Sequence, residues 1–402
     1  MSDFHQFGPV TALPRLEPGR TKELEQAILA HTSRFPVSLV LPMVPEEMNR
    51  PALSRILDEL CLVPYLESLV ISLNGAGPED YEQTRRFFHR YPGRQVIVWN
   101  ESPAVQEFLG ALQDVGLYVG EQGKGRACWL AIGYVFAADH VEYVAFQDAD
   151  VLNYSREMLA RLILPAVDPT VDFHFVKGYY ARVSDRLHGR LTRLLLTPLL
   201  TAFGRLIGED PYISYLSSFR YALSGEFAVQ RDLAVRMRLP SDWGLEIVTL
   251  FEAIRHRTPR RICQAELADR YDHKHQPVSP GDPGRGLHRM ARDVTKHLLR
   301  TLAAAGVNLS DGLFRSLLAA YQREAEDSVA DSFAVSVVNH LAYDRHEEET
   351  HVQTFTQALR ASIVEFLADP LGPPLVPNWG RVWAGVTDAG ERLRAAVERG
   401  AS

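Results

Sequence analysis

Two aspartates, Asp148 and Asp150, stand just after the apolar run VEYVAF at 141–146. Carboxylates at the end of a buried strand can hold a hard divalent cation such as Mg²⁺, which takes one or two carboxylates and completes its coordination with substrate phosphate oxygens. The same pair could instead cap the backbone amides of a strand-to-loop turn. The spacing alone therefore indicates either cation-assisted phosphate chemistry or a structural turn.

A second candidate phosphate site is Gly123-Lys124-Gly125, which precedes the helix-like run ACWLAIGYVFA at 127–137. Glycines let a ligand approach the backbone closely, the start of a helix favours an anion, and lysine supplies a positive point charge. The segment is not a Walker A loop, because Lys124 is followed by glycine rather than by serine or threonine. A glycine turn with an exposed lysine is the alternative interpretation.

Basic residues gather between 182 and 193, where the chain carries four arginines and one histidine. Guanidinium groups suit carboxylate and phosphate ligands, because they can donate two parallel hydrogen bonds. The cluster therefore predicts an anion pocket, and a solvated helix face is the alternative.

Two histidine-containing runs lie further along the chain. RYDHKH at 270–275 follows a strand-like segment, so His273 could complete a metal shell or contact a phosphate, or could stand in a solvated loop. HEEETH at 346–351 has one residue too many for the zinc motif H-E-x-x-H, and we interpret it as a solvated charged run.

Apolar runs that alternate with helical patterns must position these residues. Runs at 37–43, 66–74, 94–99 and 141–150 predict strands, and each is followed by a helix-like segment. Such alternation, with strands apolar on both faces, predicts a mostly parallel sheet covered by helices. Ligands of open α/β sheets bind at the carboxyl ends of the strands, where the polar residues collect here. From about residue 285 the pattern is almost wholly helical.

Composition narrows the class of protein. The chain has 402 residues, of which 46% are hydrophobic, which is typical of a globular protein with a sizeable core. Its 43 basic and 50 acidic residues give a net charge of −7, which argues against a general nucleic-acid binder. Three separate cysteines without a C-x-x-C pair argue against a disulfide framework and a structural zinc site. Without a signal-peptide pattern or a long apolar run, we expect a cytoplasmic protein that does not engage a membrane.

Eight segments taken in order resemble the glucosyl-3-phosphoglycerate synthase family of nucleotide-sugar glycosyltransferases, which is related to the mannosylglycerate synthases. They are VSLVLPMVPEE, GKG, FQDADV, FVKGYYAR, HGRLTRLLLTPLL, LSGEFA, DWGLEIVTL and DHKHQPV. The resemblance implies an α/β chain with the GT-A fold, a Rossmann-like, mostly parallel sheet with helices on both faces, plus a C-terminal helical region. We expect a helical lead at 1–35, a nucleotide-sugar-binding half at 36–152, an acceptor-binding half at 153–284 and a helical domain at 285–402.

The resemblance also implies roles for individual residues. Donor contacts fall on Pro42, Glu46, Asn74, Lys124, Asp148, Ala149 and Asp150. Asp150 and His273 correspond to ligands of Mg²⁺, or of Mn²⁺ in its place. Acceptor contacts fall on Gly189, Arg190, Thr192 and His275. Glu246 corresponds to the carboxylate that binds the sugar, and the backbone at Leu223 would lie by the reacting anomeric carbon, so Leu223, Glu246 and Asp150 are the catalytic candidates.

The implied reaction moves glucose from UDP-glucose to the 2-hydroxyl of 3-phospho-D-glycerate with retention of configuration, in a homodimeric enzyme that supplies a compatible solute. Within the same class, the chain could instead use GDP-mannose or unphosphorylated glycerate. A nucleotidyltransferase is disfavoured because LPMVPEEMNR at 41–50 is not the glycine-rich basic loop that such enzymes carry after their first strand. A non-catalytic sugar-nucleotide-binding protein would be expected to lose Asp150 or His273, and both are present.

Overall fold

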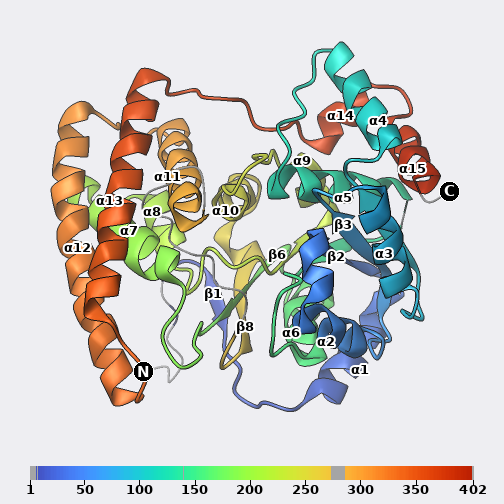
Figure 1. Cartoon of the computed structure of the whole chain (residues 1–402), viewed down its shortest axis with the longest axis horizontal. Helices are drawn as coiled ribbons and strands as arrows, with labels where there is room; N and C mark the ends of the chain where they lie inside the picture. The colour runs from blue at the N-terminus through green and yellow to red at the C-terminus, as the bar shows by residue number, and fades with distance from the viewer. Residues whose placement is uncertain (1–5, 7, 139, 273–285, 401–402) are drawn as a thin grey trace.

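One twisted eight-stranded sheet forms the centre of the computed structural model, which describes residues 6, 8–138, 140–272 and 286–400. The strand order is β1-β8-β6-β7-β5-β2-β3-β4 (Figure 1). Strand β7 runs antiparallel to both of its neighbours, and every other pairing is parallel. The prediction of a mostly parallel α/β sheet is therefore confirmed. The strands are β1 (Thr11–Leu13), β2 (Val37–Met43), β3 (Leu66–Leu73), β4 (Gln95–Trp99), β5 (Tyr143–Phe146), β6 (Phe175–Tyr180), β7 (Phe227–Gln230) and β8 (Ile262–Ala268).

The four strands predicted from apolar runs are present as β2, β3, β4 and β5. Strand β2 matches the predicted range 37–43, whereas β5 ends at Phe146, four residues before the end of the predicted range 141–150. The chain leaves the sheet there, which places Asp148 and Asp150 in the loop beyond the strand. Strand β1 was not predicted, because three residues within a polar, proline-containing lead carry too little periodicity.

Helices cover both faces of the sheet, since the strands alternate apolar side chains between two buried clusters. Val40, Val70 and Val144 face one cluster, and Leu39 and Ile71 face the other. The helices along the sheet and around the 182–193 segment are α1 (Thr21–Thr32), α2 (Pro51–Leu60), α3 (Pro78–Phe88), α4 (Pro103–Asp114), α5 (Lys124–Ala138), α6 (Arg156–Val167), α7 (Thr197–Ile207), α8 (Pro211–Ser217), α9 (Arg231–Arg236) and α10 (Leu245–His256). Three short helical turns join them, the 3₁₀ turns η1 (Pro45–Asn49) and η3 (Pro259–Arg261) and the π-helical turn η2 (Thr192–Leu196).

The C-terminal helices lie in two groups at opposite ends of the molecule (Figure 1). Helices α11 (Gly286–Ala304), α12 (Asp311–Val338) and α13 (Arg345–Ala368) pack together beside α7. The chain then crosses the molecule to α14 (Trp379–Gly385) and α15 (Ala389–Arg399), and α15 packs on α4 and α5. The domain boundaries at 35, 152 and 284 stay predictions. Among the described residues, one sheet joins strands from the first three of the four segments that these boundaries separate.

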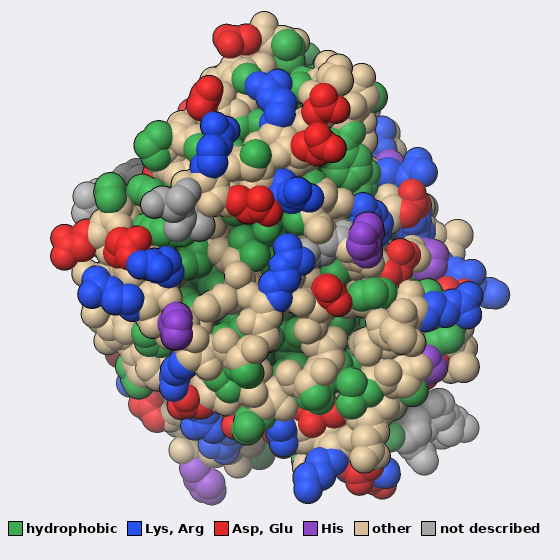
Figure 2. All heavy atoms as spheres, turned by 90° about the vertical axis from the view of Figure 1, so that its right-hand side faces the viewer, with side chains coloured by type: hydrophobic (Ala, Val, Ile, Leu, Met, Phe, Trp, Pro, Cys, Tyr) green, Lys and Arg blue, Asp and Glu red, His purple; other side chains and the backbone are tan. Residues whose placement is uncertain are grey.

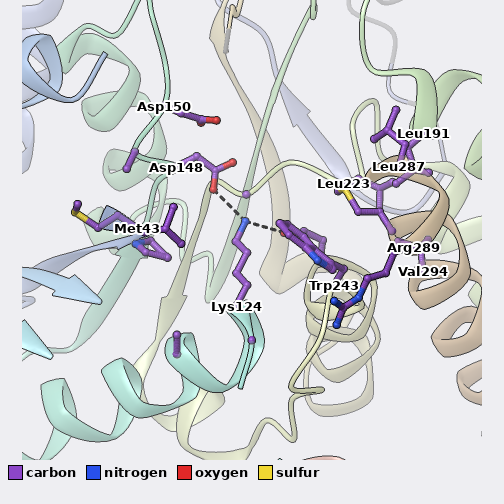
Figure 3. Close-up of a pocket in the computed structure, with 18 of the residues that line it drawn as sticks. Met43, Lys124, Asp148, Asp150, Leu191, Leu223, Trp243, Leu287, Arg289 and Val294 are labelled. Atoms are coloured by element: carbon purple, nitrogen blue, oxygen red, sulfur yellow. Dashed lines mark hydrogen bonds and ion pairs between the residues drawn. The ribbon is translucent and has the colours of Figure 1, made fainter. Parts of the chain in front are cut away.

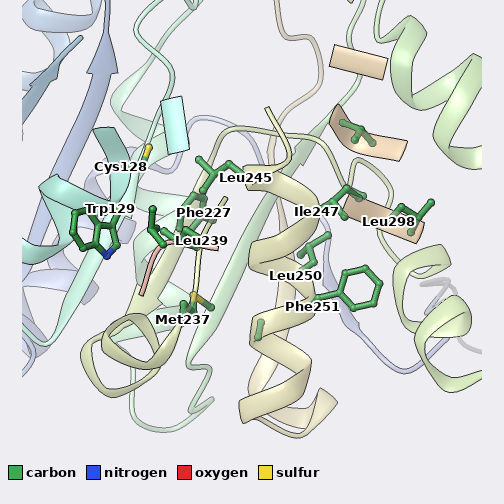
Figure 4. Close-up of a cluster of buried hydrophobic side chains, with 14 of the residues drawn as sticks. Cys128, Trp129, Phe227, Met237, Leu239, Leu245, Ile247, Leu250, Phe251 and Leu298 are labelled. Carbon is green, nitrogen blue, oxygen red and sulfur yellow. The ribbon is translucent and has the colours of Figure 1, made fainter. Parts of the chain in front are cut away.

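The first group is joined to the sheet through α10. Leu245, Ile247, Leu250 and Phe251 of α10 belong to the same buried cluster as Leu298 of α11 (Figure 4). The helix that carries Glu246 is therefore held by apolar packing as well as by the polar contacts described below.

No helix within 8–138, 140–272 and 286–400 combines the length and apolarity needed to span a bilayer. On the face shown in Figure 2, basic and acidic side chains are interspersed rather than gathered by sign.

Candidate functional site

A cavity of about 440 Å³ opens at the carboxyl ends of β2, β3 and β5. This is the edge of the sheet at which the sequence predicted a ligand site. Ten of the fourteen predicted site residues line it: Pro42, Asn74, Lys124, Asp148, Ala149, Asp150, Gly189, Arg190, Leu223 and Glu246. Residues far apart in the sequence therefore surround one space that is large enough for a small-molecule substrate.

Lys124 joins two carboxylates across the floor of this cavity. Its Nζ donates to Asp148 Oδ1 at 3.0 Å and to Glu246 Oε1 at 3.1 Å (Figure 3). Burial alone would lower the pKa of Lys124, but the two carboxylates raise it well above its ordinary value. The lysine therefore keeps its charge, and Lys124, Asp148 and Glu246 form one ionic unit.

The glycines around this unit allow segments to approach closely. A Cβ at Gly123 or Gly125 would overlap the backbone of Ser241 or Pro240, which leads into the segment carrying Glu246. Both glycines make room for protein backbone, and Gly123 also lines the cavity, so the predicted approach of a ligand to it stays a prediction. Gly225 plays a similar part for Asp148, because a Cβ there would overlap the carboxylate.

A buried carboxylate, Glu226, supports the turn that carries Asp148. It is 1% exposed and accepts hydrogen bonds from Tyr180 Oη at 2.6 Å, from the Tyr271 hydroxyl and from the Asp148 backbone N–H at 3.4 Å. The two tyrosines also stack, with ring centroids 3.6 Å apart. These contacts fix the end of β5 against the end of β8.

Lys177 of β6 is hydrogen-bonded to the turn that follows Leu223. Its ammonium is fully buried and donates to the Ser224 carbonyl at 2.7 Å, while Ser224 Oγ donates to the Gly178 carbonyl at 2.6 Å. Burial lowers the pKa of Lys177 to about 8, although Glu246 and Glu226 act in the opposite direction. The Leu223–Gly225 backbone is thereby fixed at the wall of the cavity.

Asp242 links the segment that carries Glu246 to helix α11. The Asp242 carboxylate accepts from the Gly244 backbone N–H at 2.9 Å, at the start of α10. It also accepts from His297 Nε2 at 2.9 Å and from Lys296 Nζ at 2.8 Å, and both residues belong to α11. Burial would raise the pKa of Asp242, but these two partners hold it well below its ordinary value. The first turn of α10 is thus anchored to α11.

Basic residues line the other side of the cavity. Gly189 has a φ of +68°, a conformation that strains any residue with a Cβ, and helical backbone begins at Arg190. Arg190 and Arg182 both line the cavity, and Arg182 Nη1 donates to Tyr221 Oη at 3.2 Å. The cluster at 182–193 therefore presents guanidinium groups to the same space as Lys124.

Four predicted site residues are not among the lining. Glu46 points into solvent, and the neighbouring buried Glu47 lines the cavity instead. Thr192 is buried in η2 without lining the cavity, and its Oγ1 has no hydrogen-bond partner among the described residues. His273 and His275 lie outside the described residues. The roles assigned to all of these residues stay predictions.

Several lining residues escaped the sequence analysis as individual candidates. Arg182 stood in the basic cluster without being singled out, and Tyr221, Arg289 and Met290 gave no motif. Arg289 and Met290 come from α11, so only the tertiary fold brings them to the carboxyl end of the sheet.

The chemistry of the donor set fits a hard divalent cation. Asp148 and Asp150 both line the cavity from the turn after β5. Within the described residues, no three His, Cys, Asp or Glu side chains gather as a metal cluster. Two carboxylates with room for phosphate oxygens are what Mg²⁺ typically uses.

Known proteins identify the family. The glucosyl-3-phosphoglycerate synthase of Persephonella marina is 39% identical over 398 residues, which cover 99% of this chain and 98% of that protein. The enzyme of the same name from Methanococcoides burtonii is 33% identical over 90% of this chain and 89% of its own. The chain belongs to the glucosyl-3-phosphoglycerate synthase family. It is a glycosyltransferase, as its resemblance implied. No protein-family model matches it.

Solved structures of glucosyl-3-phosphoglycerate synthase from Mycobacterium tuberculosis share the fold. One, in complex with Mn²⁺, UDP-glucose and phosphoglyceric acid, has a TM-score of 0.53 at 24% identity and covers 75% of this chain and 89% of that chain. Another, with Mg²⁺ and UDP, has a TM-score of 0.52 at 23% identity and covers 75% of this chain and 88% of that chain. The predicted GT-A glycosyltransferase fold is confirmed.

Proposed function

We propose that this glucosyl-3-phosphoglycerate synthase homologue transfers glucose from UDP-glucose to the 2-hydroxyl of 3-phospho-D-glycerate and retains the α-configuration. The observation that carries the proposal is the single cavity lined by Lys124, Asp148 and Glu246 on one side and by Arg190 and Arg182 on the other. A sugar nucleotide and a small phosphorylated acceptor are both anionic, so a site for both needs separate cationic groups.

On the donor side, we assign the departing diphosphate to Lys124 and the sugar hydroxyls to Glu246. The ammonium is shared between Asp148 and Glu246. A diphosphate beside Lys124 would compete with Asp148 for that ammonium, while Glu246, bound to Lys124 through Oε1, would accept from sugar hydroxyls through its other oxygen. The leaving group would then depart next to a charge that is already in position.

The retaining outcome is what the resemblance to the family implies, and the carboxylates around the cavity bear on how retention would be achieved. Glu226 is buried and occupied by two tyrosine hydroxyls and a backbone amide, which makes it unsuited to attack the anomeric carbon. Asp148 and Glu246 are both tied to Lys124. Attack by the acceptor on the face that the diphosphate leaves, with the leaving phosphate taking the acceptor proton, needs no protein nucleophile.

A divalent cation belongs to the proposal because of the carboxylates at the end of β5. We place Mg²⁺, or Mn²⁺, at Asp150 with Asp148 nearby, and His273 stays a predicted ligand. When bound, the cation would supply Lewis-acid neutralisation of the diphosphate.

A donor and acceptor screen tests the proposal. UDP-glucose, ADP-glucose, GDP-glucose and GDP-mannose are each paired with 3-phosphoglycerate and with glycerate, and products are followed by mass and by the anomeric NMR coupling. We expect the UDP-glucose and 3-phosphoglycerate pair to give an α-glucoside, with turnover lost in EDTA and restored by Mg²⁺ or Mn²⁺. A preference for GDP-mannose, a preference for glycerate or a β-linked product would each contradict the corresponding part.

A further inference from the structure

The basic acceptor side of the cavity is held by helix α13, which lies more than 150 residues further along the chain. In Figure 1, α12 and α13 stand beside α7, next to the segment that carries Arg190. Glu347 and Glu348 precede His351 by four and three residues, so both carboxylates lie on the same side of α13 as His351. That face meets the arginines of the 182–193 cluster.

Arg193 is fixed by this face in a fully partnered arrangement. Its two terminal nitrogens donate to Glu348 at 2.7 and 3.0 Å, and Nη1 also donates to Ser332 Oγ of α12 at 2.7 Å. Its Nε donates to the His188 carbonyl at 3.0 Å. Arg193 therefore ties the acceptor segment to α12 and α13 and acts as a structural anchor.

Arg190, which lines the cavity, is held differently. Its Nη1 lies 3.1 Å from Nε2 of His351 and 3.5 Å from Oε1 of Glu347. Glu347 is 45% exposed, so its pairing with Arg190 is weak and easily exchanged for another anion. His351 is 5% exposed, so its contact with Arg190 is the fixed one.

The chemistry of this contact defines the state of His351. An arginine can only donate, so Nε2 of His351 must accept, and the imidazole must be neutral with its proton on Nδ1. That Nδ1 is buried and has no hydrogen-bond partner among the described residues. Burial and the charge of Arg190 both lower the pKa of His351, which favours the neutral ring. His351 is therefore buried with Nδ1 unpaired among the described residues, while its Nε2 accepts from the Arg190 guanidinium.

We propose that His351 is a positioning residue for the acceptor: it orients the Arg190 guanidinium toward the cavity, and the acceptor's anionic group replaces Glu347 at Arg190. This assignment makes α13 part of the acceptor site and gives the C-terminal helical region a role in substrate recognition. The 346–351 run is therefore no solvated linker, because Glu348 and His351 are buried against arginines. The inference rests on the proposed function, since it requires an anionic acceptor at Arg190.

Steady-state kinetics of His351 variants test the proposal. His351→Ala should raise the acceptor KM about tenfold, while kcat and the donor KM stay within twofold. His351→Gln should recover most of this loss, because the amide oxygen can accept from Arg190 as Nε2 does. His346→Ala, an exposed histidine on the same helix, is the matched control and should match the wild type.

A double variant separates positioning from a general structural role. If His351 acts through Arg190, then adding His351→Ala to Arg190→Ala should leave the acceptor KM of the single Arg190→Ala variant unchanged. Multiplying losses would overturn the proposal, as would an unaltered acceptor KM in His351→Ala. An equal fall in donor and acceptor parameters together with a lowered melting temperature in both His351→Ala and His351→Gln would overturn it too.

The same experiments distinguish this inference from the proposed function. Wild-type enzyme that fails to glucosylate 3-phosphoglycerate would contradict the proposed function. Wild-type turnover with an unchanged acceptor KM in His351→Ala would contradict the inference alone.

Discussion

At the scale of single residues, the side of the cavity that we propose for the donor depends on the charge of Lys124. Its ammonium is the group that separates the carboxylates of Asp148 and Glu246, which both lie about 3 Å from it. Without it, two partly buried carboxylates would share one site with an anionic substrate.

Replacing Lys124 by methionine tests this dependence. We expect Lys124→Met to lower the donor kcat/KM by about a hundredfold or more, because two charge-assisted contacts are lost and the diphosphate meets repulsion. Initial rates at varied UDP-glucose measure the effect, with the exposed Lys22→Met as control. A variant with an altered acceptor KM and a normal donor KM would place Lys124 on the wrong side of the cavity.

The buried Lys177 should make the free energy of unfolding depend on pH. Burial lowers its pKa in the folded protein from 10.5 to about 8, so the unfolded chain binds more protons than the folded one between these values. The contribution of Lys177 to the free energy of unfolding should therefore be constant below pH 8 and grow above it. Relative to Lys177→Met, the wild type should gain roughly 3 kcal/mol between pH 8 and pH 10.5.

Urea unfolding of the wild type and of Lys177→Met at pH 7.5, 9 and 10 measures this difference. Lys22→Met, which removes a solvated ammonium, is the control. A stability difference that shrinks as the pH rises would show that the folded protein binds the proton of Lys177 more tightly than the unfolded chain.

Residue types and spacing were enough to indicate Lys124 and Asp148, because each stands in a short pattern with a chemical meaning, whereas the resemblance singled out Arg190 within the 182–193 cluster. Residue types and spacing could not indicate Lys177, since within FVKGYY it is one polar residue in an apolar strand. Its burial follows from the pairing of β6 with β7 and β8 on either side. Glu47 was missed for a different reason, because neighbouring residues of a 3₁₀ turn point in different directions and only the structure decides between Glu46 and Glu47.

At the scale of elements, α10 is the part of the proposed donor site that a C-terminal helix anchors. Glu246 lies in the first turn of α10, and Asp242 connects the start of that helix to His297 of α11. A Cβ at Gly244 would overlap the His297 ring, so the two elements are in direct contact there. A sequence pattern indicates both helices but gives no information on their packing.

A double-mutant cycle between Asp242→Asn and His297→Gln measures this link. We expect each single change to lower the donor kcat/KM about tenfold, because the first turn of α10 loses its anchor. The loss of unfolding free energy in the double variant should be smaller than the sum of the losses in the two single variants. The difference, which is the coupling energy, should be about 1–3 kcal/mol. Additive effects would mean that Asp242 and His297 act independently of each other.

At the scale of the whole molecule, the sheet could be predicted and the path of the C-terminus could not. Alternating apolar runs indicated the four strands β2 to β5 and the helices between them, because their periodicity is local. Helices α14 and α15 return across the molecule, and the contacts of α15 with α4 and α5 are long-range. This return covers α5 through two stacked tryptophans, Trp129 and Trp379.

Trp379 makes several of the contacts through which this C-terminal segment packs on α5. Its ring stacks on Trp129 at 4.5 Å, its Nε1 donates to the Trp129 carbonyl at 2.8 Å, and Trp129 Nε1 donates to the Pro377 carbonyl at 2.7 Å. Trp379→Ala should therefore cost about 3–5 kcal/mol in unfolding free energy, more than Trp383→Ala, whose ring is only partly buried.

A substitution at Gly133 of α5 tests whether the Trp379 ring packs against this helix. A Cβ at Gly133 would overlap the Trp379 ring, so Gly133→Ala should destabilise the wild type. In the Trp379→Ala background the space is open, and the same change should stabilise the protein by up to about 1 kcal/mol, because alanine favours a helix more than glycine does. Unfolding of the four proteins in urea measures the cycle. A Gly133→Ala change that destabilises both backgrounds equally would show that the Trp379 ring is not what requires glycine in α5.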